Sequence, residues 1–161
     1  MFEYTICFIK RGNQILLLNR EKTSGWMGSW NGVGGKIEKG ETPYNSIIRE
    51  VVEETGIKLL EAEYKGDVTW ENNGKDFGGM YVFLAEVPTN FEYKTPKKVE
   101  EGILDWKNIE WILHPKNTGI ALNIPKFLPK ILENDEIYEH RCYFENDHLK
   151  KVEIVREIKG E

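Results

Sequence analysis

The sequence predicts a single domain of the α+β fold class. Its 161 residues suit one hydrophobic core and are too few for two comfortable ones. Strand-like and helix-like segments are mixed without a regular β-α-β alternation, and no internal repeat is found. We therefore expect one domain that covers residues 1–161.

The expected strands are short apolar runs rich in β-prone residues. Residues 4–19 read as a hairpin, because two such runs flank the turn-like residues 10–13. The run at residues 80–87 is the most apolar of the later strands, so we expect it at the centre of the sheet. The other expected elements are strands at residues 64–71 and 108–112, loops at 72–79 and 88–102, an amphipathic helix after Pro125, and a closing hairpin at 137–144 and 149–158.

A helix is expected from Pro43 to Thr55, and its limits are well marked. Thr42 suits the N-cap, Pro43 the first helical position and Gly56 the C-terminal stop. Apolar residues recur along it at helical spacing, which predicts a stripe that faces the core. The stripe consists of Tyr44, Ile47, Ile48, Val51 and Val52.

Residues 24–36 are expected to be irregular and to approach a ligand. The segment contains five glycines and two tryptophans. Glycine allows the backbone to turn tightly and to come close to another group. This segment is therefore a candidate part of a binding site.

Composition and charge limit the classes of function. Hydrophobic residues make up 40% of the chain and charged residues 30%, and no apolar run approaches the roughly 18 residues that a membrane span needs. The N-terminus lacks the pattern of a secretory signal, so we expect a soluble, cytoplasmic protein. Cys7 and Cys142 lie in apolar strand patterns and are expected to be buried thiols.

A net charge of −5 argues against binding to nucleic-acid polymers, which requires clustered positive charge. It does not argue against a nucleotide substrate, because a bound cation can invert the local field. Nothing in the sequence points to a particular oligomeric state.

Three carboxylates near the end of the expected helix are unfavourable on local energetics alone. Glu50, Glu53 and Glu54 stand at positions i, i+3 and i+4 and share one side of the helix. Like charges at these spacings cost about 0.2 to 0.5 kcal/mol per pair, and the negative end of the helix dipole opposes them further. A solvated acidic face is the usual explanation. A divalent cation is the other, because Arg49 alone cannot neutralise three carboxylates.

The residues around this cluster resemble the signature of the Nudix hydrolase family. The chain reads Gly35-x5-Glu41-x7-Arg49-Glu50-Val51-x-Glu53-Glu54-x-Gly56-Ile57, and every fixed position of the Nudix box is filled. The resemblance implies the Nudix fold, a mixed β-sheet sandwiched between helices (α/β/α). It also implies hydrolysis of a nucleoside diphosphate linked to another group by an activated water.

The resemblance assigns roles within this region. Glu50, Glu53 and Glu54 would bind the metal, Mg²⁺ or alternatively Mn²⁺, beside the turn at Gly35. Glu41 and Arg49 are spaced to brace the loop against the helix. A downstream acidic residue usually completes such a site, and we assign Glu101 to this role. The general base stays open among Glu50, Glu101 and Glu53.

The stretch Trp30-Asn31-Gly32-Val33-Gly34-Gly35-Lys36 resembles the W-N-G-x-G-G-K stretch of MutT-like enzymes, which hydrolyse oxidised purine nucleoside triphosphates such as 8-oxo-dGTP. This implies that Asn31 hydrogen-bonds the purine and Thr5 lines the base pocket, while Arg20 takes the place of a lysine near the phosphates. The backbone of Gly34, Gly35 and Lys36 would complete the substrate site.

Three large side chains are candidate walls of the base pocket. Trp26, Trp70 and Met80 could stack on a purine or enclose it, although such residues more often belong to the core. One departure concerns base selection: the MutT-like relatives have a tryptophan and paired aspartates where this chain has residues 121–124, Ala-Leu-Asn-Ile. Asn117 or Asn123 could replace an aspartate there.

Other functions are compatible with parts of the pattern. A Nudix hydrolase acting on a nucleotide sugar, an undamaged pyrimidine triphosphate or a coenzyme would share the metal site. A nucleotide-binding regulator would keep the fold without catalysis, but no glutamate of the box is missing. Isomerase chemistry on isoprenoid diphosphates would require a reactive cysteine, and Cys7 shows no sign of activation.

Overall fold

The computed structural model describes residues 1–20, 29–133 and 135–159. These residues form a ten-stranded mixed sheet and three helices. In chain order the elements are β1 (Tyr4–Arg11), β2 (Gln14–Arg20), β3 (Trp30–Asn31), β4 (Val33–Lys36), α1 (Pro43–Thr55), β5 (Glu63–Asn72), β6 (Lys75–Val87), β7 (Lys97–Lys98), β8 (Gly102–Asn108), α2 (Ile109–Leu113), α3 (Ile124–Glu133), β9 (Ile137–Glu145) and β10 (His148–Ile158).

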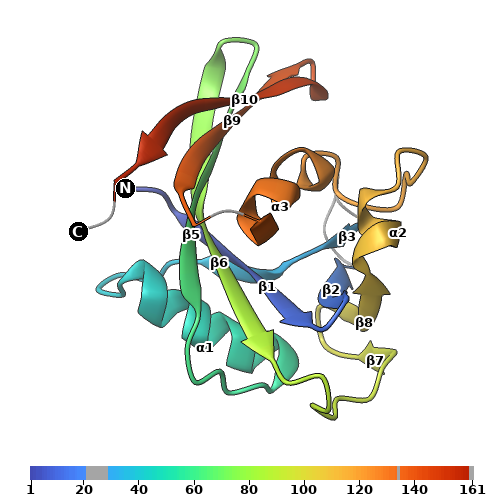
Figure 1. Ribbon diagram of the computed structural model, residues 1–161. Coiled ribbons are helices and arrows are strands. Elements are labelled where there is room, and N and C mark those ends of the chain that lie inside the picture. Colours follow the sequence, from blue (N-terminus) through green and yellow to red (C-terminus); the bar gives the residue numbers. More distant parts are fainter. Residues whose placement is uncertain (21–28, 134, 160–161) are drawn as a thin grey trace.

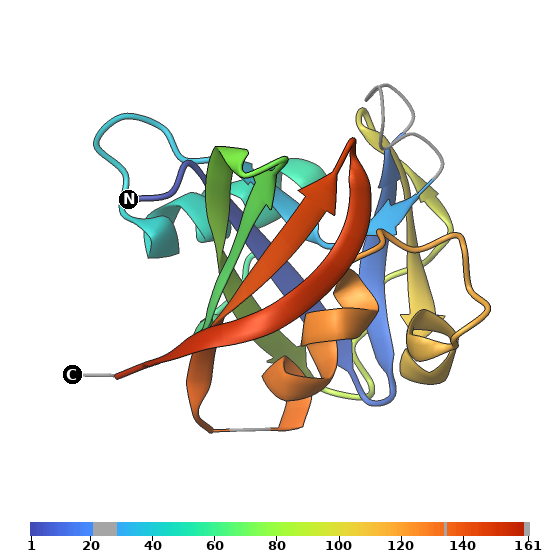
Figure 2. The ribbon, with the colours of Figure 1, turned by 90° about the horizontal axis from the view of Figure 1, so that it is seen from above.

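The sheet runs in the order β10-β9-β5-β6-β1-β2-β8-β7, with β3 paired to β2 and β4 paired to β1. Helix α1 lies on one face of the sheet and α3 on the other (Figures 1 and 2). This is the expected α+β arrangement of a mixed sheet between helices. Among the described residues, no helix is long and apolar enough to cross a membrane.

The core is divided by the sheet into two clusters. Alternate residues of a strand point to opposite faces, so Phe8 of β1 contacts Phe127 of α3, whereas Cys7 and Ile9 pack on the α1 face. Strand β1 is buried on both faces, which explains its continuous apolar run. Both cysteines are buried free thiols, as predicted, and burial raises the pKa of Cys7 to about 12.

Most of the predicted elements are confirmed. The hairpin at residues 4–19 corresponds to β1 and β2, the helix 43–55 to α1, and the closing hairpin to β9 and β10. The helix after Pro125 is α3, which begins at Ile124 and contains Pro129. The apolar strand at residues 80–87 is the second half of β6, between β5 and β1 in the interior of the sheet.

Four predictions about local structure were wrong. Residues 102–108 form the strand β8 and residues 109–113 form the helix α2, so the strand expected at 108–112 is misplaced. The loop at 72–79 is a tight hairpin, because Asn72 pairs with Lys75. Residues 97–98 of the expected loop 88–102 form β7. Residues 30–31 and 33–36 of the expected irregular segment form β3, which pairs with β2, and β4, whose glycines allow close pairing with β1.

The stripe on α1 is narrower than predicted. Ile47 and Val51 are fully buried, whereas Tyr44 and Val52 are about two-fifths exposed. Glu54, which shares one side of the helix with Glu50 and Glu53, is 5% exposed. The last turn of the helix therefore brings the Glu54 carboxylate into the interior of the protein.

Candidate active site

The site is built on the loop and helix that follow β4. Thr42 caps α1, with its hydroxyl accepting the Asn45 N–H at 3.1 Å, and Pro43 begins the helix. Gly56 ends it in a left-handed conformation, with its N–H donating to the Val52 carbonyl at 2.8 Å. These caps determine where the last two turns lie, and the glutamates stand on those turns.

Arg49 connects the loop to the helix. Its guanidinium donates to both carboxylate oxygens of Glu41, at 2.6 and 2.8 Å, in a bidentate pair. It also donates to the Lys36 carbonyl at 3.2 Å. This pairing lowers the pKa of Glu41 to about 2. The same guanidinium reaches Glu50 at 2.8 Å and Glu53 at 3.1 Å, so it partly neutralises the acidic cluster.

Two consecutive glycines let the loop approach the sheet and the helix. A Cβ on Gly34, whose φ is +154°, would lie 2.1 Å from the Thr5 carbonyl oxygen. A Cβ on Gly35 would lie 2.6 Å from the carboxylate of Glu50. Gly35 therefore leaves room for a carboxylate of α1 directly against the loop backbone.

Glu54 is held inside the protein by the loop and by Arg20 at the end of β2. One of its carboxylate oxygens accepts the Gly34 N–H at 2.8 Å, and the other lies 3.0 Å from the Arg20 guanidinium. Arg20 also donates to the Gly34 carbonyl at 3.1 Å. Burial raises the pKa of Glu54, and Arg20 opposes that shift.

Glu101 lies next to this group. The residue that follows it, Gly102, pairs with Arg20 across β2 and β8. The Oε2 atom of Glu101 is buried and, among the described residues, has no hydrogen-bond partner. A buried carboxylate oxygen without a partner is costly, because nothing replaces the water it has lost.

The carboxylates do not form a finished metal site as they stand. Within residues 1–20, 29–133 and 135–159, no three acidic, imidazole or thiol groups converge to hold a metal ion. Instead these carboxylates form ion pairs, because Arg49 engages Glu50 and Glu53 and Arg20 engages Glu54.

The donor set nevertheless suits a hard divalent cation. The glutamates of α1 offer only oxygen atoms, and Gly34 and Gly35 leave room for Glu54 and Glu50 beside a loop without side chains at these positions. Burial also raises the pKa of Glu50, which is only 14% exposed, so its negative charge lacks sufficient compensation. The chemistry of these residues therefore fits a divalent cation, provided that Arg20 and Arg49 release the glutamates.

The residues expected to bind the substrate are not all brought together. Thr5 is buried on the α1 face, where its hydroxyl lies 3.4 Å from that of Ser46. Asn31 pairs with Leu18 of β2, and its side-chain oxygen accepts the Gly32 N–H at 2.8 Å. Thr5 and Asn31 therefore lie on different strands, β1 and β3.

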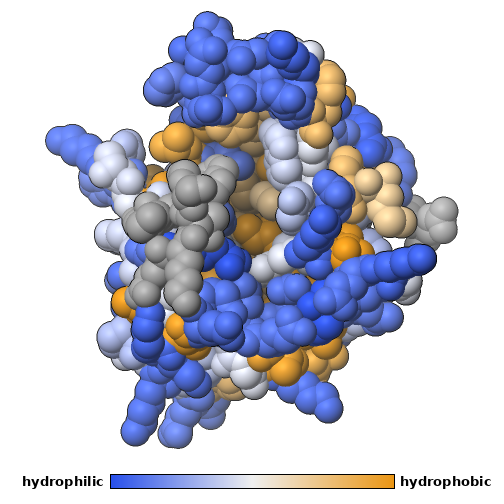
Figure 3. Space-filling model, turned by 180° about the vertical axis from the view of Figure 1, so that it is seen from behind, coloured by the Kyte–Doolittle hydropathy of each residue, from blue (hydrophilic) through white to orange (hydrophobic). Residues whose placement is uncertain are grey.

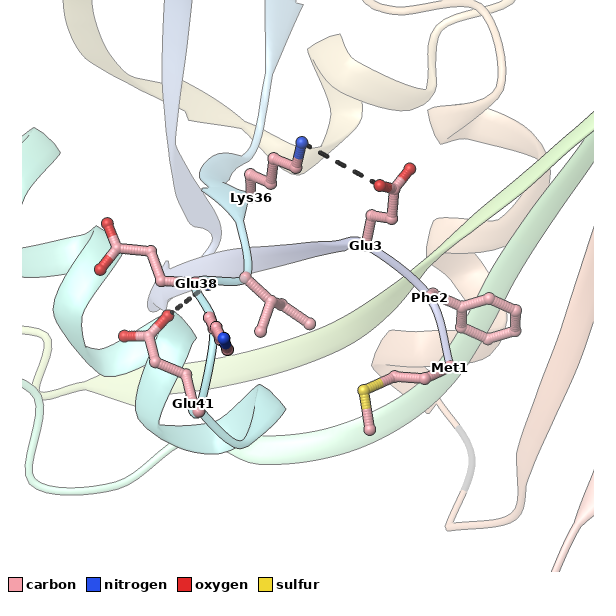
Figure 4. Close-up of a pocket in the computed structure, with 9 residues that line it drawn as sticks. Met1, Phe2, Glu3, Lys36, Glu38 and Glu41 are labelled. Carbon is pink, nitrogen blue, oxygen red and sulfur yellow. Dashed lines mark hydrogen bonds and ion pairs between the residues drawn. The ribbon is translucent and has the colours of Figure 1, made fainter.

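Lys36 points away from the carboxylates. Its ammonium is directed towards Glu3, at 4.0 Å, across a shallow groove of about 290 Å³ on the outside of the loop (Figure 4). Its side chain is 68% exposed. Of the site glutamates, only Glu41 lines this groove.

Trp70 and Met80 pack at the margin of the α3-side core. The Trp70 ring lies 6.4 Å from that of Tyr4, and Gly78 leaves room for it. These contacts agree with a core role and leave each residue partly exposed. Trp26, the third candidate wall, lies outside the described residues.

The two asparagines considered as base readers differ. Asn117 is committed to its own loop, because its oxygen accepts the Gly119 N–H and its amide donates to the Trp111 carbonyl, both at 2.8 Å. Asn123 donates to the Cys142 thiol at 3.7 Å. The backbone before Asn123 is joined to β3, since the Ala121 N–H donates to the Trp30 carbonyl at 2.9 Å.

This face of the molecule is hollowed, with hydrophobic atoms on the floor of the hollow and mostly hydrophilic residues around it (Figure 3). An apolar floor with polar groups at its margin is the usual character of a site for a small organic ligand.

Sequence reasoning missed the ion pair between Arg20 and Glu54. The two residues are far apart in the chain, and no local pattern links them. The only available signal was a basic residue at the end of an apolar strand beside a glycine-rich segment.

Comparison with known proteins identifies related sequences. Residues 3–131 match the family model of the NUDIX domain. The uncharacterized Nudix hydrolase YvcI of Bacillus subtilis is 31% identical over 106 residues, 65% of each chain. The oxidized purine nucleoside triphosphate hydrolase of Mus musculus is 28% identical over 110 residues, 68% of this chain and 67% of that one. The NAD-capped RNA hydrolase NudC of Pasteurella multocida is 40% identical over 102 residues, 56% of this chain and 38% of that one.

The chain thus spans about two thirds of the first two relatives and well under half of the third. Among solved structures, the MutT protein from Bacillus halodurans is similar over almost the whole length. The two share 26% identity with a TM-score of 0.78, over 96% of this chain and 98% of that one.

Proposed function

Since the chain belongs to the Nudix hydrolase family, we propose that it is a divalent-cation-dependent pyrophosphohydrolase of nucleoside triphosphates, with oxidised purine nucleotides such as 8-oxo-dGTP as its substrates and a monophosphate and pyrophosphate as products. The observation that carries this proposal is the loop that joins Asn31 to the glutamates. Its backbone touches Glu50 through Gly35 and Glu54 through Gly34. A base held near Asn31 would therefore have its phosphates close to the acidic cluster.

In this proposal Glu50, Glu53, Glu54 and the Gly35 backbone hold Mg²⁺ or Mn²⁺, and Glu101 completes the set. A bound cation would offset the charge of the diphosphate and lower the pKa of a water. Three glutamates could accept the proton of that water. Glu50 and Glu53 are engaged by Arg49, whereas the buried Oε2 of Glu101 has no hydrogen-bond partner within the described ranges. Glu101 is therefore our choice for the general base.

The choice of an oxidised purine is supported by the W-N-G-x-G-G-K stretch and by relatives from mouse and zebrafish named oxidized purine nucleoside triphosphate hydrolase. A second candidate is hydrolysis of another nucleoside diphosphate derivative, such as a coenzyme-type substrate. It is favoured by the absence of carboxylates at residues 119–124 and by the similarity to an NAD-capped RNA hydrolase.

A substrate panel separates the two. Steady-state rates would be measured with Mg²⁺ for 8-oxo-dGTP, the canonical triphosphates, NAD, ADP-ribose and dinucleoside polyphosphates, with the products identified. We expect the highest kcat/KM for 8-oxo-dGTP. A clear preference for NAD, ADP-ribose or a polyphosphate would favour the second candidate, and no hydrolysis of any of them would favour a non-catalytic nucleotide binder.

The metal assignment is tested with Glu53→Gln. Glu53 is 57% exposed, so the free energy of unfolding should change by less than about 0.5 kcal/mol. Turnover should fall roughly a hundredfold or more, because a metal ion contributes several kcal/mol to the transition state. The matched control is Glu61→Gln, an exposed glutamate beyond the helix that should leave turnover unchanged. Near-normal turnover in Glu53→Gln would refute the assignment.

A further inference from the structure

Arg20 holds an unusual position relative to the acidic cluster. Its guanidinium lies 3.0 Å from the buried carboxylate of Glu54 and donates to the carbonyl of Gly34 at 3.1 Å. The Arg20 side chain is 26% exposed and that of Glu54 only 5%. Arg20 is thus the charge partner of the buried Glu54 carboxylate.

The same contact keeps Glu54 from serving as a metal ligand. A carboxylate that is 5% exposed has few directions open to it, and its two oxygens are taken by the Gly34 N–H and by Arg20. A cation that approaches Glu54 therefore meets a guanidinium already in place. Two positive groups at one buried carboxylate repel each other strongly, since solvent screening is weak there.

We propose that Arg20 is an internal counter-ion of Glu54, which competes with the divalent cation for this carboxylate and is released when the cation binds. The inference rests on the proposed metal site. Arg20 is a positioning residue in this scheme, because it acts through Glu54. Once released, its guanidinium is available to an anionic substrate, so cation and substrate would each favour the binding of the other.

Arg49 does not have this role. Its main partner is Glu41, which it engages through two hydrogen bonds outside the group of proposed ligands. It can give up Glu50 and Glu53 and still brace the loop. Among the described residues, Arg20 forms its ion pair with Glu54 and donates to the Gly34 carbonyl, and its release therefore changes the charge balance at the site.

The experiment measures Mn²⁺ binding by the whole chain, with free Mn²⁺ followed by electron paramagnetic resonance. The variants are Arg20→Met and Arg20→Lys. We expect Arg20→Met to bind Mn²⁺ about tenfold more tightly than the wild type, equivalent to about 1.4 kcal/mol. Arg20→Lys should fall between them, because an ammonium keeps the charge but not the paired contacts to Glu54 and Gly34.

Two controls separate this effect from simpler ones. Lys39→Met removes an exposed positive charge from the same loop without touching a site carboxylate, and its Mn²⁺ affinity should stay within about twofold of the wild type. Arg156→Met removes a partner of the buried Glu139, far from the loop. We expect Arg156→Met and Arg20→Met both to lower the metal-free melting temperature, because each removes an arginine partner from a buried carboxylate, but Arg156→Met should leave Mn²⁺ affinity unchanged. In Arg20→Met alone, added Mn²⁺ should restore the melting temperature.

The inference is overturned if Arg20→Met binds Mn²⁺ no more tightly than the wild type, or if Lys39→Met gains as much affinity. The first result would mean that Arg20 does not compete, and the second that only overall charge matters. Absence of Mn²⁺ binding by the wild type would overturn the proposed metal site itself and the inference with it. Circular dichroism of each variant confirms that the fold is retained.

Discussion

At the scale of single residues, the two neighbouring glycines of the loop have different tasks. Gly34 lies against backbone atoms of β1, which cannot move aside, and Gly35 lies against the end of a side chain, which can. The first therefore concerns the fold and the second concerns the placement of Glu50. This separation provides a direct test of how the loop supports the site.

Gly34→Ala should destabilise the protein by about 3 kcal/mol or more, because its Cβ would overlap the Thr5 carbonyl and its φ of +154° is strained for alanine. Gly35→Ala should cost only about 1 kcal/mol of stability but lower kcat/KM about a hundredfold, since it displaces the Glu50 carboxylate. Urea unfolding and steady-state kinetics on the two variants check this. Equal losses of stability would contradict the distinction.

The sequence nominates candidate residues for the site, but it does not show which of them pair with one another. The spacing of the box identifies the glutamates and Arg49, because the family signature is local. The contact between Arg20 and Glu54 joins the end of β2 to the end of α1, and it depends on how α1 packs against the sheet. Likewise the burial of Glu54 could not be predicted, since helical spacing alone placed it with the exposed Glu53.

At the scale of elements, the well-marked helix was predicted to the residue, and the short one was missed. Helix α1 has a capping threonine, a proline at its start and a glycine at its end, so its limits follow from local chemistry. Helix α2 has only five residues, and only Ile112 is buried. So short an apolar run has no usable periodicity, and it reads equally well as a strand.

The three strands β5, β9 and β10 are joined by a buried charge that the proposed site does not use. Glu139 is 5% exposed and accepts hydrogen bonds from Thr69, Arg141 and Arg156, each at 2.8 Å. Burial alone would raise the pKa of Glu139, but these three donors lower it below its usual value. The charged form is therefore the one that stabilises this part of the sheet.

Glu139→Gln should lower the free energy of unfolding by about 2 kcal/mol at neutral pH, because hydrogen bonds to the charged carboxylate are lost. A carboxyl whose folded pKa is depressed contributes fully above the unfolded pKa, and the contribution disappears as the pH falls through the folded pKa. The difference between variant and wild type should therefore shrink below about pH 4.5. Urea unfolding from pH 7 to pH 3 measures it.

The control for this prediction is Glu145→Gln, an exposed glutamate at the end of the same strand, which should leave stability within about 0.5 kcal/mol at every pH. If the loss in Glu139→Gln were the same at pH 3 as at pH 7, the carboxylate would not act through its charge.

At the scale of the whole molecule, the class was predictable and the strand order was not. Mixed segments without βαβ alternation indicated α+β, and the sheet between α1 and α3 agrees. The parallel pairs β1 with β6 and β5 with β9 join strands that are distant in sequence. Hydrophobic pattern predicts that a strand is buried but not which strand lies beside it, because any apolar neighbour satisfies the same pattern.

The parallel pair of β1 and β6 also bears on how the protein acquires its shape. Tyr4 lies opposite Met80 and Arg11 opposite Val87. A contact between such distant points requires closure of a long loop of chain before any hydrogen bond rewards it, and such contacts slow folding. During synthesis, β1 can complete its pairing with β6 only after residue 87 has left the ribosome. The glycine-rich strand β4, which pairs with β1 within the first 36 residues, does not have to wait for β6 in the same way.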